Sequence, residues 1–343
     1  MIQSIHIEKF KSIENQKFDF KPLTILTGTN SSGKSSLIQA ILWHSYTYNF
    51  KLNRILEGYF DKLKVRKCDV AFGRAFFNES LANAKIKSVQ SDTAKWGMGV
   101  GLFEDNLFYL SANRIGPENA VLDNKNMMCG TNGEYIFGFY YNNKDLALRN
   151  KKLVKEGVKN ELAMQVNFWL NQILDLNLEL FTRNGHGSND EILIAYKNLD
   201  LKNKNQKLLP FNLGAGVSYL AKILILGLSL KESDIFIVEN PEVHLHPKAV
   251  SKFAEFFAFL AQSGVQIIIE THSEHIINKM RYLIFKERLA EENLQIYYRE
   301  KFDTPFISIR INKNGKYIDE NGDKMDFPAG FFDSDLNELL EMA

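Results

Sequence analysis

The 343-residue sequence predicts an α/β protein with a mixed central sheet flanked by helices. Two observations support this fold class. Apolar runs of strand type occur at 23–27, 235–238 and 265–269, and helical segments alternate with strands through 208–300, which is typical of parallel strands in one sheet. The first run leads through a Gly/Ser-rich turn into a helical segment at 35–42. We therefore expect both ends of the chain to build the sheet, with an inserted β/helical lobe between them.

The first half of the chain supplies part of the sheet and the start of the lobe. Residues 1–8 alternate like a strand, and 1–45 are expected to hold a strand pair followed by the Gly/Ser-rich unit. Residues 50–112 contain short apolar and aromatic runs and are expected to be mainly β. Residues 115–190 are expected to form a mainly helical lobe. The evidence for that helix is a set of apolar side chains that recur every four residues: Val154, Val158, Leu162 and Val166.

The second half completes a single domain that covers residues 1–343. Residues 191–300 alternate strands and helices, and 301–343 are expected to form a small C-terminal extension. No heptad pattern lasts long enough for a long coiled coil.

Composition excludes several classes of protein. The formal net charge is +1, so any polyanion site must be a local patch rather than a property of the whole surface. Two cysteines, Cys68 and Cys129, lack the spacing of a metal site and fit a reducing cytoplasm. The longest apolar run, 223–230, is too short to span a bilayer, and the N-terminus lacks the apolar core of a signal peptide. A cytoplasmic protein without a membrane partner is expected.

The Gly/Ser-rich turn fills the template of a phosphate-binding P-loop. Residues 28–35 read GTNSSGKS, between a strand and a helix. Glycines let successive backbone N–H groups turn toward phosphates, and the helix N-terminus adds partial positive charge. Lys34 is expected to reach the β- and γ-phosphates, and the Ser35 hydroxyl to hold Mg²⁺. The residues predicted to bind ATP here are Asn30, Ser31, Ser32, Gly33, Lys34, Ser35 and Ser36.

Acidic residues follow the apolar run at 235–238. Glu239 ends this strand, and Asn240, Pro241 and Glu242 follow it. An acid at the carboxyl end of a strand beside a P-loop is placed to hold Mg²⁺ or its water shell, so Ser35 and Glu239 are the predicted metal ligands. The alternative is an acidic strand end that faces solvent.

Two further segments complete the predicted nucleotide-binding motifs. The run at 265–269 is followed by Glu270, Thr271 and His272, and a histidine at that strand end can sense a γ-phosphate. Gly214, Gly216 and Ser218 open an apolar helix, and a glycine-rich helix start is a second anion-binding terminus.

In this order, the motifs resemble those of ABC-type ATPase heads. The motif sequences look still more like those of a prokaryotic branch related to RecF, SMC-type heads and OLD-family ATPases. The segments that carry this resemblance are ENPE at 239–242, HLHP at 244–247, ETHSEH at 270–275 and YLSANRIGP at 109–117. The segment DFPAGFFD at 326–333 is similar to a C-terminal domain of unknown function found on many of these ATPases. The resemblance runs from residue 1 to about 340 and implies a P-loop fold of the ABC-head type.

The resemblance also implies a role for each motif. Two heads sandwich two ATP molecules, and the Gly214–Gly216–Ser218 signature of one head caps the γ-phosphate on the other. Glu239 takes the place of the magnesium-associated acid, and His272 that of the switch histidine. Asn240 stands where the catalytic glutamate is usual, and an amide can orient water but cannot accept its proton, so Glu242 is the candidate base. No clear glutamine occupies the family's Q-loop within 58–75.

Other features were weighed against this interpretation. The histidines at 244, 246, 272 and 275 suggest metal chelation, but they fall inside the ATPase motifs. Lys151, Lys155 and Lys159 are spaced like one helix face, which is either a solvated face or a DNA-backbone contact. Too few residues follow His272 for the nuclease domain that OLD-family proteins carry.

The sequence therefore predicts an ATPase that binds ATP and Mg²⁺, dimerises around them and controls a partner effector. The resemblance implies a nuclease or toxin as effector and a role in bacterial defence against phages. Two alternatives remain open: a RecF-like DNA-binding repair ATPase, and an ATP-gated scaffold that does not hydrolyse ATP, which Asn240 favours.

Overall fold

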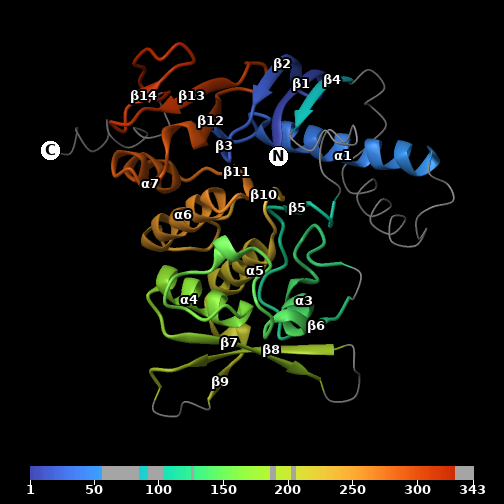
Figure 1. Ribbon diagram of the computed structural model, residues 1–343, viewed down its shortest axis with the longest axis vertical. Helices are drawn as coiled ribbons and strands as arrows, with labels where there is room; N and C mark the ends of the chain where they lie inside the picture. Colours follow the sequence, from blue (N-terminus) through green and yellow to red (C-terminus); the bar gives the residue numbers. More distant parts are fainter. Residues whose placement is uncertain (56–84, 92–102, 125–126, 186–190, 202–205, 329–343) are drawn as a thin grey trace.

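The apolar runs near both ends of the chain form one seven-stranded sheet at the centre of the molecule (Figure 1). The computed structural model describes residues 1–55, 85–91, 103–124, 127–185, 191–201 and 206–328. The strand order of the sheet is β14 (Tyr317–Ile318), β13 (Ile307–Ile311), β12 (Leu294–Arg299), β3 (Leu23–Gly28), β11 (Gln266–Glu270), β10 (Ile235–Glu239) and β5 (Leu107–Leu110). The strands from β12 to β5 are parallel, and β13 and β14 are antiparallel, so the predicted mixed sheet is confirmed.

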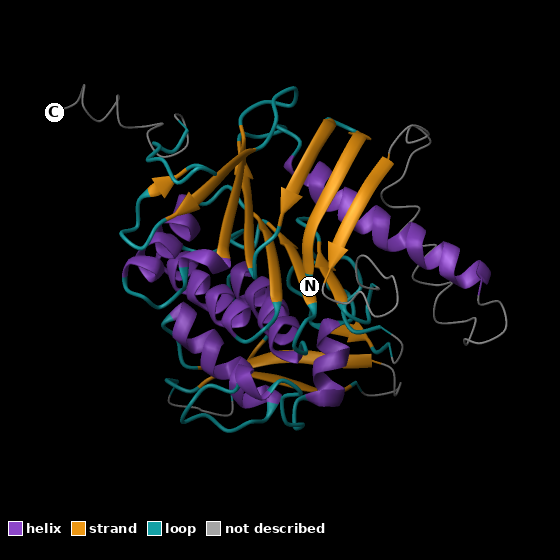
Figure 2. Ribbon diagram, turned by 45° about the horizontal axis from the view of Figure 1, so that its top comes forward, coloured by secondary structure: helices purple, strands orange, loops and turns teal. Residues whose placement is uncertain are grey.

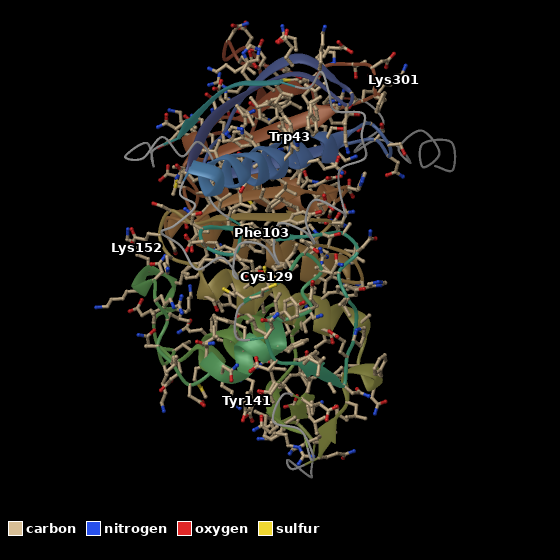
Figure 3. The ribbon with its side chains drawn as sticks, turned by 90° about the vertical axis from the view of Figure 1, so that its right-hand side faces the viewer. Trp43, Phe103, Cys129, Tyr141, Lys152 and Lys301 are labelled. Carbon is tan, nitrogen blue, oxygen red and sulfur yellow. The ribbon has the colours of Figure 1, made fainter. Side chains whose placement is uncertain are left out.

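The first face of this sheet is covered by the N-terminal unit. Strands β1 (Ile2–Phe10), β2 (Ile13–Asp19) and β4 (Lys85–Ser91) form an antiparallel sheet that lies beside α1 (Lys34–Ile55) (Figure 2). Apolar side chains of β1, β2, α1 and the central strands pack into one core. Trp43 of α1 and Phe103, just before β5, pack against this core (Figure 3). The strand after Met1 and the helix after the P-loop thus form as the sequence predicts.

The second face is covered by three helices. These are α5 (Ala215–Ser229), α6 (Pro247–Gln262) and α7 (Glu274–Phe285), and their apolar sides share a second core with the lobe. All five residues of both β10 and β11 are buried, because helices cover both faces of these strands. Short 3₁₀ helices at Lys151–Leu153, Pro210–Asn212 and Glu291–Asn293 connect the larger elements.

The lobe lies below the central sheet in the view of Figure 1. Its antiparallel sheet has the order β6 (Ala120–Leu122), β8 (Glu191–Asn198) and β7 (Leu178–Asn184), and β9 (Lys207–Leu208) pairs with β8. Two helices pack on it, α3 (Ile136–Asn143) and α4 (Leu162–Leu174). The region 115–190, expected to be mainly helical, contains the helices α3 and α4 together with the strands β6 and β7.

Two sequence predictions need correction. The helix inferred from the spacing at 154–166 begins only at Leu162, because Gly157 has a φ of 78° and Glu161 is extended. Gln165 of α4 instead accepts a hydrogen bond from the Lys155 backbone N–H and donates to the Lys159 carbonyl. The lysines at 151, 155 and 159 therefore do not share one helix face.

The second correction concerns the expected β insertion at 50–112. Its last strand, β5, pairs with β10 and forms the edge of the central sheet, so it belongs to that sheet rather than to an insertion. Cys68, the 58–75 stretch and most of the remaining insertion lie outside the described residues. Within the described ranges, each helix is too short or too polar to cross a bilayer.

Candidate functional site

The P-loop turns sharply between β3 and α1. Gly28 has a φ of 139°, and a Cβ there would lie 1.9 Å from the Arg299 carbonyl oxygen, so only glycine fits. Gly33, with a φ of 89°, ends the loop, and the Ser36 N–H donates to its carbonyl. The Thr29 N–H donates to the Arg299 carbonyl at 3.2 Å. Residues 29–33 are thus clamped between two strand ends in the curled form that a phosphate-binding loop requires.

Lys34 lies inside this loop. Its Nζ donates to the carbonyl oxygens of Thr29 at 2.6 Å and Gly28 at 3.2 Å, and the residue is 3% exposed. Burial lowers the pKa of the ammonium, while the nearby Glu270 carboxylate opposes that shift. A lysine held this way has its charge at the centre of the loop, where phosphate oxygens would take over the two carbonyl contacts.

Two glutamates end neighbouring strands of the central sheet. Glu239 and Glu270 are register neighbours on the parallel strands β10 and β11, so their side chains leave the same face of the sheet. Glu239 Oε2 accepts a hydrogen bond from the Ala112 N–H at 3.0 Å, and burial raises the pKa of this carboxyl. Glu270 Oε1 accepts a hydrogen bond from the Ser35 hydroxyl at 3.1 Å. Burial, together with the charge of Glu239, raises the Glu270 pKa to about 7.

The residues after Glu239 turn toward the switch histidine. Asn240 has a left-handed φ of 42°, and its N–H donates to the Glu270 carbonyl at 2.7 Å. Glu242 Oε1 accepts a hydrogen bond from the His272 backbone N–H at 2.9 Å, and burial raises the pKa of Glu242. A carboxyl with a raised pKa beside the phosphate loop has the character of a general base.

His272 lies beside the P-loop rather than only capping α7. Its ring hydrogen-bonds to the Gly28 backbone, and its pKa is lowered by burial and then by the charge of Lys34. A neutral imidazole next to Lys34 is placed to follow phosphate binding. The structure therefore brings together residues 28–36, 239–242 and 270–272.

The segment after β5 holds the carboxyl end of β10 in place. Arg114 is 3% exposed and donates to the carbonyl oxygens of Ser111 at 3.0 Å, of Asn240 at 2.8 Å and of Glu239. Its guanidinium lies 5.5 Å from the centre of the Tyr219 ring on α5. Arg114 thereby joins the acidic strand end to the signature helix.

The predicted signature contacts the site through the loop after β10. Gly214 caps α5, and a Cβ on Gly216 would lie 2.4 Å from the His244 carbonyl oxygen. The His244 ring stacks on Tyr219 with 5.2 Å between ring centres. Ser218, by contrast, is 1% exposed and points into the core near Tyr196, so its hydroxyl does not face a second subunit. The exposed part of the signature is Gly214 and the residues before it.

Sequence reasoning missed three supporting residues. Glu270 lies in the 270–275 motif and has no predicted role, although its position at the end of an apolar run, like that of Glu239, is a usable signal. Arg299 is 2% exposed, and its guanidinium donates to the Ser12 hydroxyl and the Ser12 carbonyl, both at 2.7 Å, which ties the β1–β2 turn to the P-loop. Ser12 and Arg299 lie too far apart in sequence for any local pattern to reveal the contact.

The structure does not support a separate metal site on the histidines. His246 caps α6 by accepting the Lys248 N–H, and His244 stacks on Tyr219. Among the described residues, no group of three or more His, Cys, Asp or Glu side chains has the arrangement of a metal centre. The oxygen atoms of Ser35, Glu239 and Glu270 fit Mg²⁺ carried by a nucleotide, since Mg²⁺ takes few protein ligands beside phosphate oxygens and water.

Comparison with known proteins agrees with this geometry. A family model described as "AAA domain" matches residues 4–212, and one described as "AAA domain, putative AbiEii toxin, Type IV TA system" matches residues 160–278. The chain belongs to the AAA-domain family. The matched ranges of this AAA-domain protein include the P-loop, the signature and the acidic strand end.

Individual relatives are more distant. The Old nuclease of Escherichia phage P2 is 24% identical over 336 residues, which cover 81% of this chain and 57% of the nuclease. The chain thus spans little more than half the length of that relative. An ATP/GTP phosphatase of Helicobacter pylori is 48% identical over 44 residues, 12% of each chain.

A solved structure shares the fold. An Smc head bound to the C-winged helix domain of ScpA aligns with a TM-score of 0.51 and 13% identity, covering 91% of this chain and 98% of the head. The predicted resemblance of this AAA-domain protein to ATPase heads of the SMC and OLD type is confirmed, and with it the ABC-head fold.

Proposed function

We propose that this protein is an ATP-driven switch that dimerises around Mg-ATP and controls a partner effector. The observation that carries the proposal is the convergence on one sheet edge of Lys34 in a closed P-loop, the carboxylates of Glu239 and Glu242, and His272. Phosphoryl transfer to water needs charge neutralisation and an aligned nucleophile, and these groups supply both.

The chain's own residues have defined tasks in this scheme. The N–H groups of residues 30–36 bind the phosphates and Lys34 neutralises their charge. Magnesium, when bound with ATP, supplies further charge neutralisation at the β- and γ-phosphates. Glu242 accepts the proton of the attacking water, Asn240 orients that water, and His272 donates to the γ-phosphate. The Gly214 helix terminus of a second subunit closes the site.

We propose hydrolysis coupled to a partner effector, and a role in defence against phages, with two comparisons as support. One matching family description names a toxin of a type IV toxin–antitoxin system, and the Old nuclease belongs to a phage. The alignment covers 57% of that nuclease, and we propose a nuclease or toxin as the output. A cytoplasmic location accords with such an output.

A second candidate is a scaffold that binds ATP without hydrolysing it. Asn240 favours this scaffold, because its amide side chain stands where a catalytic base is usual. Hydrogen bonds with Arg114 and Glu270 hold its backbone in a left-handed conformation. The RecF-like alternative is weakened because the lysines at 151, 155 and 159 do not line one helix face.

Steady-state phosphate release from Mg-ATP separates the two candidates. Lys34→Ala removes the phosphate contact and gives the background rate of phosphate release. In ATP, the mass of Lys34→Ala should stay that of a monomer, while the mass of the wild type should double. Glu242→Gln keeps the side-chain shape and the acceptor for the His272 N–H but cannot take a proton, so we expect turnover to fall at least about 100-fold with dimerisation retained. A wild type no faster than Lys34→Ala identifies the scaffold. A wild type whose mass is unchanged by ATP refutes the dimer model.

A further inference from the structure

We infer that Glu270, rather than Glu239, is the carboxylate that holds Mg²⁺ beside Ser35 when this chain binds ATP. The inference rests on the proposed function and assigns its metal site. Ser35 is the second residue of α1, and its hydroxyl donates to Glu270 Oε1 at 3.1 Å. A serine hydroxyl at this position of a P-loop is a Mg²⁺ ligand, so the side chain it already contacts is the nearest acid to the metal position.

The Glu239 carboxylate forms hydrogen bonds toward β5 rather than toward the P-loop. Its Oε2 accepts the Ala112 N–H at 3.0 Å, and its carboxylate also hydrogen-bonds with the Tyr109 side chain. Both partners belong to β5 and the segment after it, at the edge of the sheet away from β3. Glu239 thus joins β5 to β10, and moving its carboxylate to a metal would leave the partly buried Ala112 N–H without that acceptor.

Glu270 has a carboxylate oxygen, Oε2, that is available to bind a cation. The residue is 6% exposed, and among the described residues no donor reaches its Oε2. A buried carboxylate oxygen without a hydrogen bond is costly, and a cation relieves that cost. Strand β11 lies between β3 and β10, so Glu270 is also closer than Glu239 in strand order to the P-loop that carries the phosphates.

The charge balance of the site leads to the same assignment. Lys34 is the cation that interacts with Glu270 while its ammonium rests on the carbonyls of Gly28 and Thr29. When Lys34 neutralises phosphate charge instead, Glu239 and Glu270 become two buried carboxylates with less compensation. A divalent ion held by Ser35 and Glu270 would restore this balance, with Glu239 as a more distant carboxylate. Mg²⁺ typically uses one or two carboxylates in this manner.

The test compares ATP affinity with and without Mg²⁺ in full-length protein. Binding of ATP is measured by calorimetry in EDTA and in Mg²⁺ for the wild type, Glu270→Gln and Glu239→Gln, with the exposed Glu291→Gln as a matched control. Glutamine at 270 can still accept the Ser35 hydroxyl hydrogen bond, so affinity in EDTA also reports that the site is folded. Mn²⁺ binding in the presence of ADP, followed by electron paramagnetic resonance, gives a second readout that does not depend on turnover.

The expected result is a loss of at least about 10-fold in the Mg²⁺ enhancement of ATP affinity for Glu270→Gln, with EDTA affinity not reduced and Mn²⁺ binding weakened in parallel. Glu291→Gln should keep the enhancement, and Glu239→Gln should lose less of it than Glu270→Gln. If Glu239→Gln loses it and Glu270→Gln keeps it, the assignment is wrong and the metal belongs to Glu239. If the wild type binds ATP in neither buffer, the proposed function itself fails.

Discussion

Arg114 gives the sharpest prediction for stability. Its guanidinium donates to the carbonyl oxygens of Ser111, Glu239 and Asn240, and it is 3% exposed, so solvent screens these bonds little. A hydrogen bond from a charged donor contributes about 1.5–3 kcal/mol, but bonds to a single group are not additive. Removing one member of a buried charged network costs about 3–5 kcal/mol. We therefore expect Arg114→Ala to lower the free energy of unfolding by about 4 kcal/mol.

Arg114→Lys should recover only part of that loss. An ammonium keeps the charge but lacks the planar fork that reaches separate carbonyls, and it would satisfy about one of the three. We expect a loss of about 2–3 kcal/mol for lysine.

Urea unfolding followed by circular dichroism measures both variants. Arg183→Ala is the control, because Arg183 is an exposed arginine on β7, and surface substitutions usually change stability by less than about 0.5 kcal/mol. An Arg114→Ala loss below about 1 kcal/mol, indistinguishable from the control, would refute the claim that Arg114 holds the end of β10 in place.

Two other substitutions test the contacts around α5. Gly216→Ala places a Cβ 2.4 Å from the His244 carbonyl oxygen and should lower the free energy of unfolding in urea by about 1–3 kcal/mol. Gly214→Ala is the control and should cost less, because nothing lies within 4 Å of a Cβ there. Equal losses of stability in the two variants would contradict the close approach at Gly216. Lys222 is fully buried and pairs with Glu118 at 2.7 Å, so Lys222→Met should destabilise the protein by about 2–4 kcal/mol. Adding Glu118→Gln should recover part of that loss in a double-mutant cycle, and strict additivity would show that the two charges are not coupled.

Much of the nucleotide site could be predicted because its motifs are local. The P-loop is one continuous segment, so its residues are neighbours in sequence as well as in space. The acids at 239 and 242 and the histidine at 272 follow apolar runs, and the carboxyl ends of parallel strands meet at one edge of a sheet. The mixed sheet and the helices on both faces followed from the same alternation.

The remaining features depend on contacts that no local pattern records. Ser218 has the spacing of an exposed signature residue, but its position on α5 turns it toward Tyr196 in the core. The four-residue spacing of Val154 and Val158 resembles a helix, yet the left-handed Gly157 between them ends any regular backbone. Arg114 supports β10 across 125 residues of sequence, and only the fold brings the two together.

The clamp on the P-loop has a consequence for synthesis of the protein. The loop is shaped by atoms that lie far along the chain: the Thr29 hydroxyl donates to the Glu300 carbonyl, 271 residues further on, and strand β12 pairs with the whole of β3. A ribosome-bound chain in which β12 has not yet been translated therefore lacks the strand that holds one side of the P-loop. Pairings between residues so far apart in sequence also form late in folding. A chain in which β12 has not yet been translated is therefore not expected to bind a nucleotide at this loop.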